Sequence, residues 1–444
     1  MAAELREVDA TVPGVRGRPR REGLLLHLHP RAVPAEALRF SRTLGLGGAA
    51  LVLYLLAVAT GLLLLAAYDP SAERAHLAVR VLVREVPFGA FVRSAHAWAA
   101  DGALAVTLLH LLRVFFRGGH LPPRHANWLL GLVLLFLVIA SAYTGRLLPW
   151  DQLSFWSVTI SSGMLKYVPL LGPPLLRLAR GGAEVGPRTL SLFFGLHVAI
   201  LPFTLFALLP VHFWLVRKAG GVLLPQPGGV AVPVRALTPA SPNLLLREGV
   251  AALVTIAAVL ILAAVADAPL LAQANPGMSP DPAKGPWYLM GLQELLVHLD
   301  PAFAAVVIPP LAVGLTVALP FFGRDERHSA AWFHSPRGAR LALHAAVAGA
   351  ALTAAAVLLG ELLRRAPARL SLLPRWVGAG VLPVLALAAL VGGAGWLARG
   401  RGASRLEVVQ AVFAFAAVVV LVLTAVGVFL RGPGMALTWP WKVP

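Results

Sequence analysis

The sequence has 444 residues, of which 58% are hydrophobic and 13% charged, and its mean hydropathy is +0.77. This composition excludes an ordinary soluble domain and indicates a polytopic membrane protein. The absence of cysteine excludes disulfides and thiolate metal sites. The net charge of +18 does not favour a nucleic-acid partner, because most of it lies in short segments between apolar stretches, where it sets membrane topology.

The apolar runs predict an all-α polytopic membrane protein, a four-helix bundle followed by about five further transmembrane helices. A basic cytoplasmic tail over 1–43 comes first, because no cleavage site of a signal peptide follows it directly. The expected spans are 44–67, 96–116, 127–148, 189–216, 247–267, 303–321, 340–363, 380–398 and 406–430. The first four form a domain over 44–216, a Gly- and Pro-rich linker covers 217–246, a second domain covers 247–325, and helices of unassigned role cover 326–444.

Basic segments predict the orientation of the chain. With the N-terminus in the cytoplasm, the tail and four basic loops fall on the cytoplasmic side, at 117–125, 217–221, 323–340 and 399–405. The basic segment 364–375 is an exception that falls outside. Two longer spacers, 149–188 and 268–302, both fall on the outer face, where irregular backbone can build a site at the membrane surface.

Four histidines occur at matched positions in two spans. His96 and His110 are fourteen residues apart, which is close to four helical turns and about 21 Å. His197 and His212 are fifteen apart, also about four turns. Both spans run in the same direction, so the histidines form two facing pairs at two depths. Any one of them could serve helix packing, but four at matched depth indicate axial ligands of two b-type haems.

Glycines repeat the same spacing in the two neighbouring spans. Gly47 and Gly61 are fourteen apart, and so are Gly131 and Gly145. Such glycines could simply allow close helix packing. Together with the histidines, they are predicted to leave room for the edge of a flat macrocycle, because glycine has no side chain at the point of closest approach.

These motifs, together with "GRLLPWDQLSFW" at 145–156, resemble the cytochrome b subunit of bc-type quinol–cytochrome c (or plastocyanin) oxidoreductases. The resemblance covers most of residues 40–325. The segment "RGGAEVGPRTLSLFFGLH" at 180–197 and the longer histidine spacing are more similar to the photosynthetic, short-cytochrome branch. The second half resembles the separate small subunit of that branch, here fused to the first half.

The resemblance implies an enzyme subunit that is incomplete alone, in a bacterial-type energy-transducing inner membrane. The haem of His96 and His197 would be the outer, low-potential one, and that of His110 and His212 the inner, high-potential one. Quinol would be oxidised at an outer pocket, with one electron passing to a Rieske iron–sulfur protein and then to a cytochrome c or an equivalent acceptor. The other electron would reduce quinone near the inner face, with proton translocation. A homodimer is also implied.

The sequence departs from the family pattern at the outer pocket. The family has a Pro-Glu-Trp-Tyr motif whose carboxylate accepts a quinol proton. Here the stretch reads "GPWY" at 285–288, which keeps Trp287 and Tyr288 but has Pro286 at the position of the glutamate.

A proton acceptor is still needed, because quinol oxidation releases protons into a nearly dry pocket. Glu294 is predicted to be that acceptor, as the nearest intramembrane carboxylate along the chain; the alternative is a packing or helix-end role. His298 and Asp151 are the next candidates.

The arginines that pair with haem propionates in the family are also replaced, by Ala97 and Leu192. Arg113 and Arg93 are possible substitutes, although an interfacial arginine also serves as a snorkelling anchor. Arg146, beside the outer pocket, is a third possibility.

Two other functions compete with this interpretation. One is a dihaem membrane anchor that exchanges electrons between quinone and a dehydrogenase or reductase, which would need the haems but no outer pocket. The other is a non-redox transporter with intramembrane histidines, which would bind no haem and is expected to have helices broken by Gly or Pro.

Overall fold

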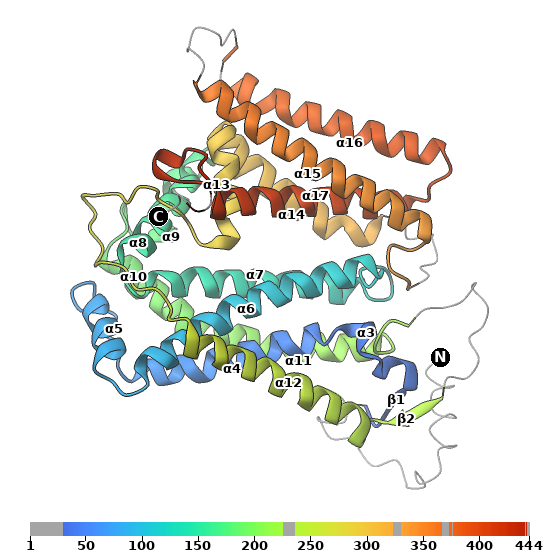
Figure 1. Ribbon diagram of the computed structural model, residues 1–444, viewed down its shortest axis with the longest axis horizontal. Helices are drawn as coiled ribbons and strands as arrows, with labels where there is room; N and C mark the ends of the chain where they lie inside the picture. Colours follow the sequence, from blue (N-terminus) through green and yellow to red (C-terminus); the bar gives the residue numbers. More distant parts are fainter. Residues whose placement is uncertain are drawn as a thin grey trace.

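The computed structural model describes residues 30–224, 236–322, 330–365, 373–374, 376–439 and 441. In these residues, nine helical segments are long and apolar enough to cross a membrane. Most of them lie alongside one another with similar axes (Figure 1). The predicted all-α polytopic fold is therefore confirmed. The predicted tail is described only from residue 30, and most of the basic segment 364–375 lies outside the described residues.

The first half contributes four spans, as predicted. They are α4 (Leu46–Leu65), α6 (Gly89–Phe116), α7 (His125–Leu147), and a continuous helix made of α10 (Pro187–Gly195), the π-helix η3 (Leu196–Ile200) and α11 (Leu201–Lys218). Helices α4 and α6 pack together, and α7 packs on α11.

The second half contributes five spans. They are α12 (Ala240–Val265), η4 (Phe303–Val307) with α14 (Ile308–Ala318), α15 (Pro336–Arg365), η7 (Val377–Val381) with α16 (Leu382–Gly400), and α17 (Arg405–Phe429). Helix α12 packs on α4 and α6, whereas α13 (Trp287–His298), α15 and α17 pack on one another.

Short elements cover the two ends of the bundle. Helices α5 (Ala75–Arg84), α8 (Gln152–Gly163) and α9 (Gly172–Arg180) lie at one end (Figure 1, left). Helix α3 (Phe40–Thr43) and a two-stranded antiparallel sheet of β1 (Ala32–Pro34) and β2 (Leu237–Pro239) lie at the other.

The two long spacers are joined directly, as expected for segments on the same face. Asp151 and Gln273 form an antiparallel bridge. The backbone N–H of Gln152 donates to the Ala272 carbonyl at 2.8 Å. The backbone N–H of Asn275 donates to the side-chain Oε1 of Gln152 at 2.6 Å. Residues far apart in sequence therefore form one continuous cover at this end of the bundle.

Basic loops meet at the opposite end. Arg124 donates to the carbonyls of Ala219 and Gly221 at 2.8 and 2.7 Å. Arg117 donates to Ala330 at 2.8 Å, which connects the first half to the start of the α15 region. Three of the segments predicted to share the cytoplasmic side thus lie together.

Helix α6 begins at Gly89, seven residues before the predicted start at 96. Arg93 lies in these added residues. In the structure, its guanidinium donates to the Ala268 and Pro269 carbonyls at 2.6 and 2.7 Å. These contacts satisfy the charged group, so the helix can extend past it.

A buried charge cluster fixes α13 to the segment that follows α17. Arg431 and Glu294 are both 0% exposed. Arg431 Nε donates to Glu294 Oε2 at 2.9 Å and Nη1 donates to Glu361 Oε2 at 3.1 Å. His298 Nε2 lies 2.9 Å from Glu294 Oε1. Three parts of the second half therefore meet at one guanidinium.

The Glu294→Gln substitution tests the weight of this cluster. Removing one partner from a buried ion pair costs about 3–5 kcal/mol, because the other charge stays buried. We therefore expect a clearly lower midpoint of thermal unfolding in detergent. Asp69→Asn is the matched control, since it makes the same chemical change in the exposed Arg74–Asp69 pair, which is worth about 1 kcal/mol or less. Equal midpoints for the two variants would contradict the assignment.

The same cluster predicts how stability depends on pH. Burial raises the pKa of Glu294, but hydrogen bonds from His298 and Arg431 and their charges lower it by more, so the pKa lies below its ordinary value of 4.5. A lowered folded-state pKa means that the stabilisation is complete above the ordinary pKa and is lost as pH falls through the lowered one. Thermal midpoints measured below pH about 4.5 should therefore fall more steeply in the wild type than in Glu294→Gln.

Candidate functional site

A cavity of about 430 Å³ lies between the two halves of the chain. Its walls come from α4, α6, α7, the start of the fourth span and the first turn of α13, and most of the lining is apolar. The functional side chains that line it are His96, His197, Asp101, Arg146, Trp287 and Tyr288. A largely apolar cavity of this size with a few convergent polar groups is typical of a binding site for a small organic molecule.

Two of the predicted ligands face each other at this cavity. The ring centroids of His96 and His197 are 6.0 Å apart, and the ring planes are at 81°. A metal–imidazole bond is about 2 Å long, so two imidazoles on opposite sides of one metal ion have centroids about 6 Å apart. The observed separation fits axial binding of one metal ion.

Hydrogen bonds fix which nitrogen of each ring is available. His96 Nδ1 lies 2.9 Å from the Ala57 carbonyl oxygen, and His197 Nδ1 lies 2.9 Å from that of Ser141. A carbonyl oxygen only accepts hydrogen bonds, so Nδ1 carries the proton in both rings. In the neutral ring, Nε2 then keeps its lone pair for a metal, and the carbonyl makes it a better ligand.

The helix around His197 has a wide turn. Residues Leu196–Ile200 form a π-helix inside an otherwise α-helical span. Such a turn takes up one extra residue. It therefore explains why His197 and His212 are fifteen apart while His96 and His110 are fourteen apart. The π-helix that accommodates the extra residue includes His197. The histidines of the two spans therefore keep matching depths.

The second pair lies about four turns further along the same two helices. His110 lies beside Gly47 of α4, and His212 lies beside Gly131 of α7. Their Nδ1 atoms are buried and have no hydrogen-bond partner among the described residues. The two pairs thus differ, because only the rings at the cavity are held by backbone carbonyls.

Each predicted glycine lies against one of the four histidines. A Cβ atom at Gly145 would be 2.4 Å from His197 Cε1, and one at Gly61 would be 3.0 Å from His96 Cε1. The corresponding distances are 3.3 Å from Gly47 to His110 and 3.7 Å from Gly131 to His212. The sequence predicted clearance for a macrocycle edge; in the structure, the closest neighbours are the imidazole rings themselves.

Trp287 and Tyr288 both reach the cavity, as expected for the outer pocket. Trp287 Nε1 donates to Asp101 Oδ1 at 3.0 Å. The Tyr288 hydroxyl is buried and has no hydrogen-bond partner among the described residues. Burial raises the pKa of Tyr288, so the phenol stays protonated and can donate a hydrogen bond to a bound molecule.

Glu294 was predicted to be the proton acceptor of this pocket, and the structure does not bring it there. Its carboxylate is held in the buried cluster with Arg431 and His298, and it is not among the residues lining the cavity. It lies two turns, about 10 Å, beyond Trp287 on α13, beside the segment that follows α17. The prediction followed distance along the chain, but those two turns carry the carboxylate past the cavity to its partner Arg431. His298 is excluded for the same reason.

The arginines proposed for propionates have different environments. Arg146 lines the cavity, and so does Arg93, although two of its donors are used by backbone carbonyls. Arg113 lies one turn after His110 and donates to the Arg42 carbonyl, while its Nε is buried without a hydrogen-bond partner in the described part of the chain. Arg146 and Arg113 therefore keep donors for an anionic group, one at each histidine pair.

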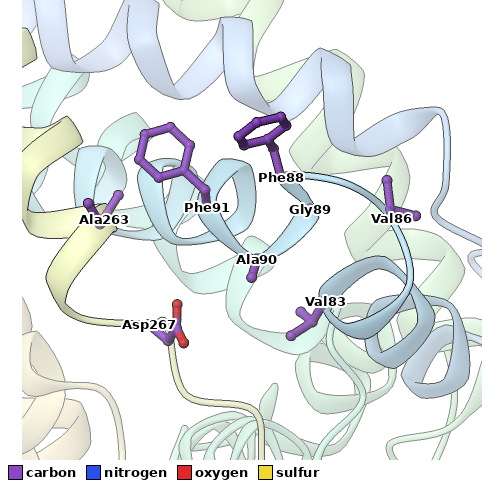
Figure 2. A pocket seen from close by; sticks show the side chains of 9 residues that line it. Val83, Val86, Phe88, Gly89, Ala90, Phe91, Ala263 and Asp267 are labelled. Atoms are coloured by element: carbon purple, nitrogen blue, oxygen red, sulfur yellow. The ribbon is translucent and has the colours of Figure 1, made fainter.

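A second hollow lies outside this site, between the turn before α6 and the end of α12. Figure 2 shows Phe88 and Phe91 on one side of it and Asp267 on the other. Asp267 is the one ionisable side chain among its lining residues. The hollow brings together no set of groups that could carry out chemistry.

Two features of the site were not predicted. A Thr-Gly pair occurs at both cavity glycines, Thr60–Gly61 and Thr144–Gly145, and each threonine hydroxyl lies within 3.5 Å of a histidine Nδ1. Asp101 is the one charged residue between His96 and His110, but its hydrogen bond with Trp287 could not be predicted from the sequence.

Comparisons with known proteins agree with this geometry. The family model described as cytochrome b/b6/petB matches residues 34–220. Cytochrome b6 of Prochlorothrix hollandica is 39% identical over 175 residues, which are 39% of this chain and 79% of that protein. Cytochrome b6 of Prochlorococcus marinus (strain MIT 9211) is also 39% identical over 175 residues, 39% of this chain and 80% of that protein.

The second half is matched in fold. A chain in the solved structure of a hyperthermophilic respiratory Complex III has a TM-score of 0.64 and 22% identity, over 96% of this chain and 98% of that chain. At that identity the similarity concerns the fold alone. The family model covers the first half, where both histidine pairs lie, and by this match and the relatives that are 39% identical the chain belongs to the cytochrome b/b6 family.

Proposed function

We propose that this chain is the dihaem cytochrome b subunit of a bc-type complex, which oxidises quinol at one membrane face and passes electrons across the membrane through two b haems to quinone. The observation that carries the proposal is the facing of His96 and His197 at 6.0 Å beside a cavity that also contains Trp287 and Tyr288. A metal-binding pair and a pocket for an organic substrate share one space.

His96 and His197 would hold one haem, and His110 and His212 the other. The fit rests on the ring separation, the free Nε2 lone pairs and the glycines that admit the rings. Bound haem iron supplies reversible one-electron transfer at two depths. Arg146 and Arg113 keep donors that suit the propionates. Backbone carbonyls on the Nδ1 atoms of the first pair increase ligand basicity, which supports the lower potential for that haem.

Quinol would bind in the cavity next to the first histidine pair. Oxidation of one quinol gives one quinone, two protons and two electrons. One electron would go to a one-electron acceptor docked at the surface, a Rieske iron–sulfur protein that passes it to a cytochrome c or equivalent, and the other into the chain's own haems. The Tyr288 hydroxyl can donate to a quinol oxygen, and the apolar walls exclude water.

The assembly expected from the family is a homodimer in an energy-transducing inner membrane. The joined spacers around Asp151 and Gln273 would form the outer face, and the basic loops around Arg124 would face the cytoplasm. Protons released on the outer side would conserve energy as a gradient. No contact with nucleic acid is expected, because the basic loops are engaged with neighbouring carbonyls.

Two competing functions fit less well. A dihaem anchor has no need of a cavity lined by Trp287 and Tyr288. A non-redox transporter is expected to have broken helices, whereas the fourth span stays continuous through its π-helix and past Pro210. The family membership of the chain also argues against a transporter.

Histidine variants test the haem assignment. Reduced-minus-oxidised spectra and haem quantitation on purified protein should give two b haems per chain. His96→Ala and His110→Ala should each lose one, and the remaining spectra should differ, because the two ligands serve different haems. Wild-type protein made with adequate haem supply but containing none would contradict the proposal.

A matched pair of glycine variants tests the clearance seen beside the rings. Gly145→Ala puts a methyl group 2.4 Å from His197 Cε1 and should displace that ring, whereas Gly131→Ala makes a normal 3.7 Å contact with His212. We expect Gly145→Ala to lose the haem at the cavity or to shift its potential, and Gly131→Ala to resemble the wild type by redox titration. Wild-type haem content and potentials in both variants would show that the glycines serve only helix packing.

A further inference from the structure

One carboxylate lies inside the apolar wall of the cavity and has no role so far. Asp101 sits in the middle of α6, within a membrane span, and its side chain lines the cavity. An ionisable group at such a depth is costly and is retained mainly for function. The argument below rests on the proposed function, because it concerns the proton that quinol must lose.

The contacts of Asp101 leave part of the carboxylate open to the cavity. Trp287 Nε1 donates to Oδ1 at 3.0 Å, and this is its one hydrogen bond within the described residues. Arg146, from α7, lines the same cavity. A group fixed by one donor, beside a cation and next to free space, has acceptor capacity left for a bound molecule.

The other groups of the cavity cannot take this role. Asp151, the second carboxylate of the lining, accepts from the backbone N–H groups of Ser154 and Leu271 and so caps α8 and joins the spacers. Arg146 and Tyr288 are protonated donors. Pro286 contributes no titratable group, and the Nε2 atoms of both histidines would bind the haem iron.

We propose that Asp101 is the catalytic proton acceptor for quinol in this cavity. In the step, the O–H bond of one quinol hydroxyl breaks, the proton forms an O–H bond on the Asp101 carboxylate, and quinol is left as its anion. The anion is then the species that gives up electrons to the acceptors named above. Trp287 is a positioning residue, because its N–H holds the carboxylate toward the cavity.

The Asp101→Asn variant removes the base and keeps the shape. In membranes that contain the full complex, duroquinol-dependent reduction of cytochrome c should fall about 100- to 10,000-fold, the usual contribution of a general base. Both haem bands after dithionite reduction should remain. Asp101→Glu should recover most of the lost rate. Asp69→Asn, the same change outside the cavity, should match the wild type.

A spectroscopic measurement separates a chemical role from a structural one. The duroquinol-induced infrared difference spectrum should contain a carboxylic-acid C=O band that shifts on ¹³C-aspartate labelling. The band should be absent in Asp101→Asn and shifted in Trp287→Phe, which keeps the ring but removes the donor. A full rate in Asp101→Asn, or a band that persists in it, would overturn the assignment.

Two further outcomes remain decisive. If Asp101→Asn loses its haems, the Asp101→Glu variant, which keeps the charge, is measured instead. Its C=O band should respond to ¹³C-glutamate labelling and no longer to ¹³C-aspartate labelling. A band that still responds to the aspartate label would assign the role to Asp151. If the wild type contains both haems but does not oxidise duroquinol, the proposed function itself fails, which is distinct from an active wild type with an equally active Asp101→Asn.

Discussion

The structure depends on the register between two helices that run in the same direction. Helix α6 presents His96 and His110, and the fourth span presents His197 and His212, and each histidine must meet its partner at the same depth. The fifteen-residue spacing in the fourth span would break this match in a regular helix. The π-helix at Leu196–Ile200 restores it. The glycines of α4 and α7 and the carbonyls of Ala57 and Ser141 then fix the ring positions.

Helical periodicity in the sequence predicts most of the membrane spans and both histidine pairs, because these features depend on the spacing of residues along one helix. The spans, the four-plus-five arrangement and the meeting of the two spacers all follow from patterns in the sequence. Contacts between helices do not follow in this way. Glu294 lies two turns along α13 from Trp287, and its partner Arg431 lies more than a hundred residues later in the chain, so no local pattern predicts their pairing. The pairing of β1 with β2 has the same long-range origin.

Carboxylates in the second half and in α6 show how the surroundings decide the role of a group. Glu294 is fully buried and bound by Arg431 and His298, so it stabilises the packing of α13. Asp101 has one donor and free space beside it. Distance along the chain favoured the first as the reactive group, whereas burial and hydrogen bonding favour the second. Burial of either carboxylate in apolar surroundings costs free energy. For Glu294 the ion pair with Arg431 offsets this cost, and for Asp101 the hydrogen bond from Trp287 does so.

The link between Arg431 and α13 has a consequence for the synthesis of the protein. Chains are made and inserted from the N-terminus, so the histidine pairs, the cavity walls and both Glu294 and Glu361 exist before Arg431 has been translated. Until then, no guanidinium binds the carboxylates of Glu294 and Glu361. A chain interrupted before residue 431 would therefore lack the guanidinium that binds both Glu294 and Glu361 and holds α13 and α15 to the segment after α17. The packing of α13 and α15 is therefore completed only when the segment after α17 has been made.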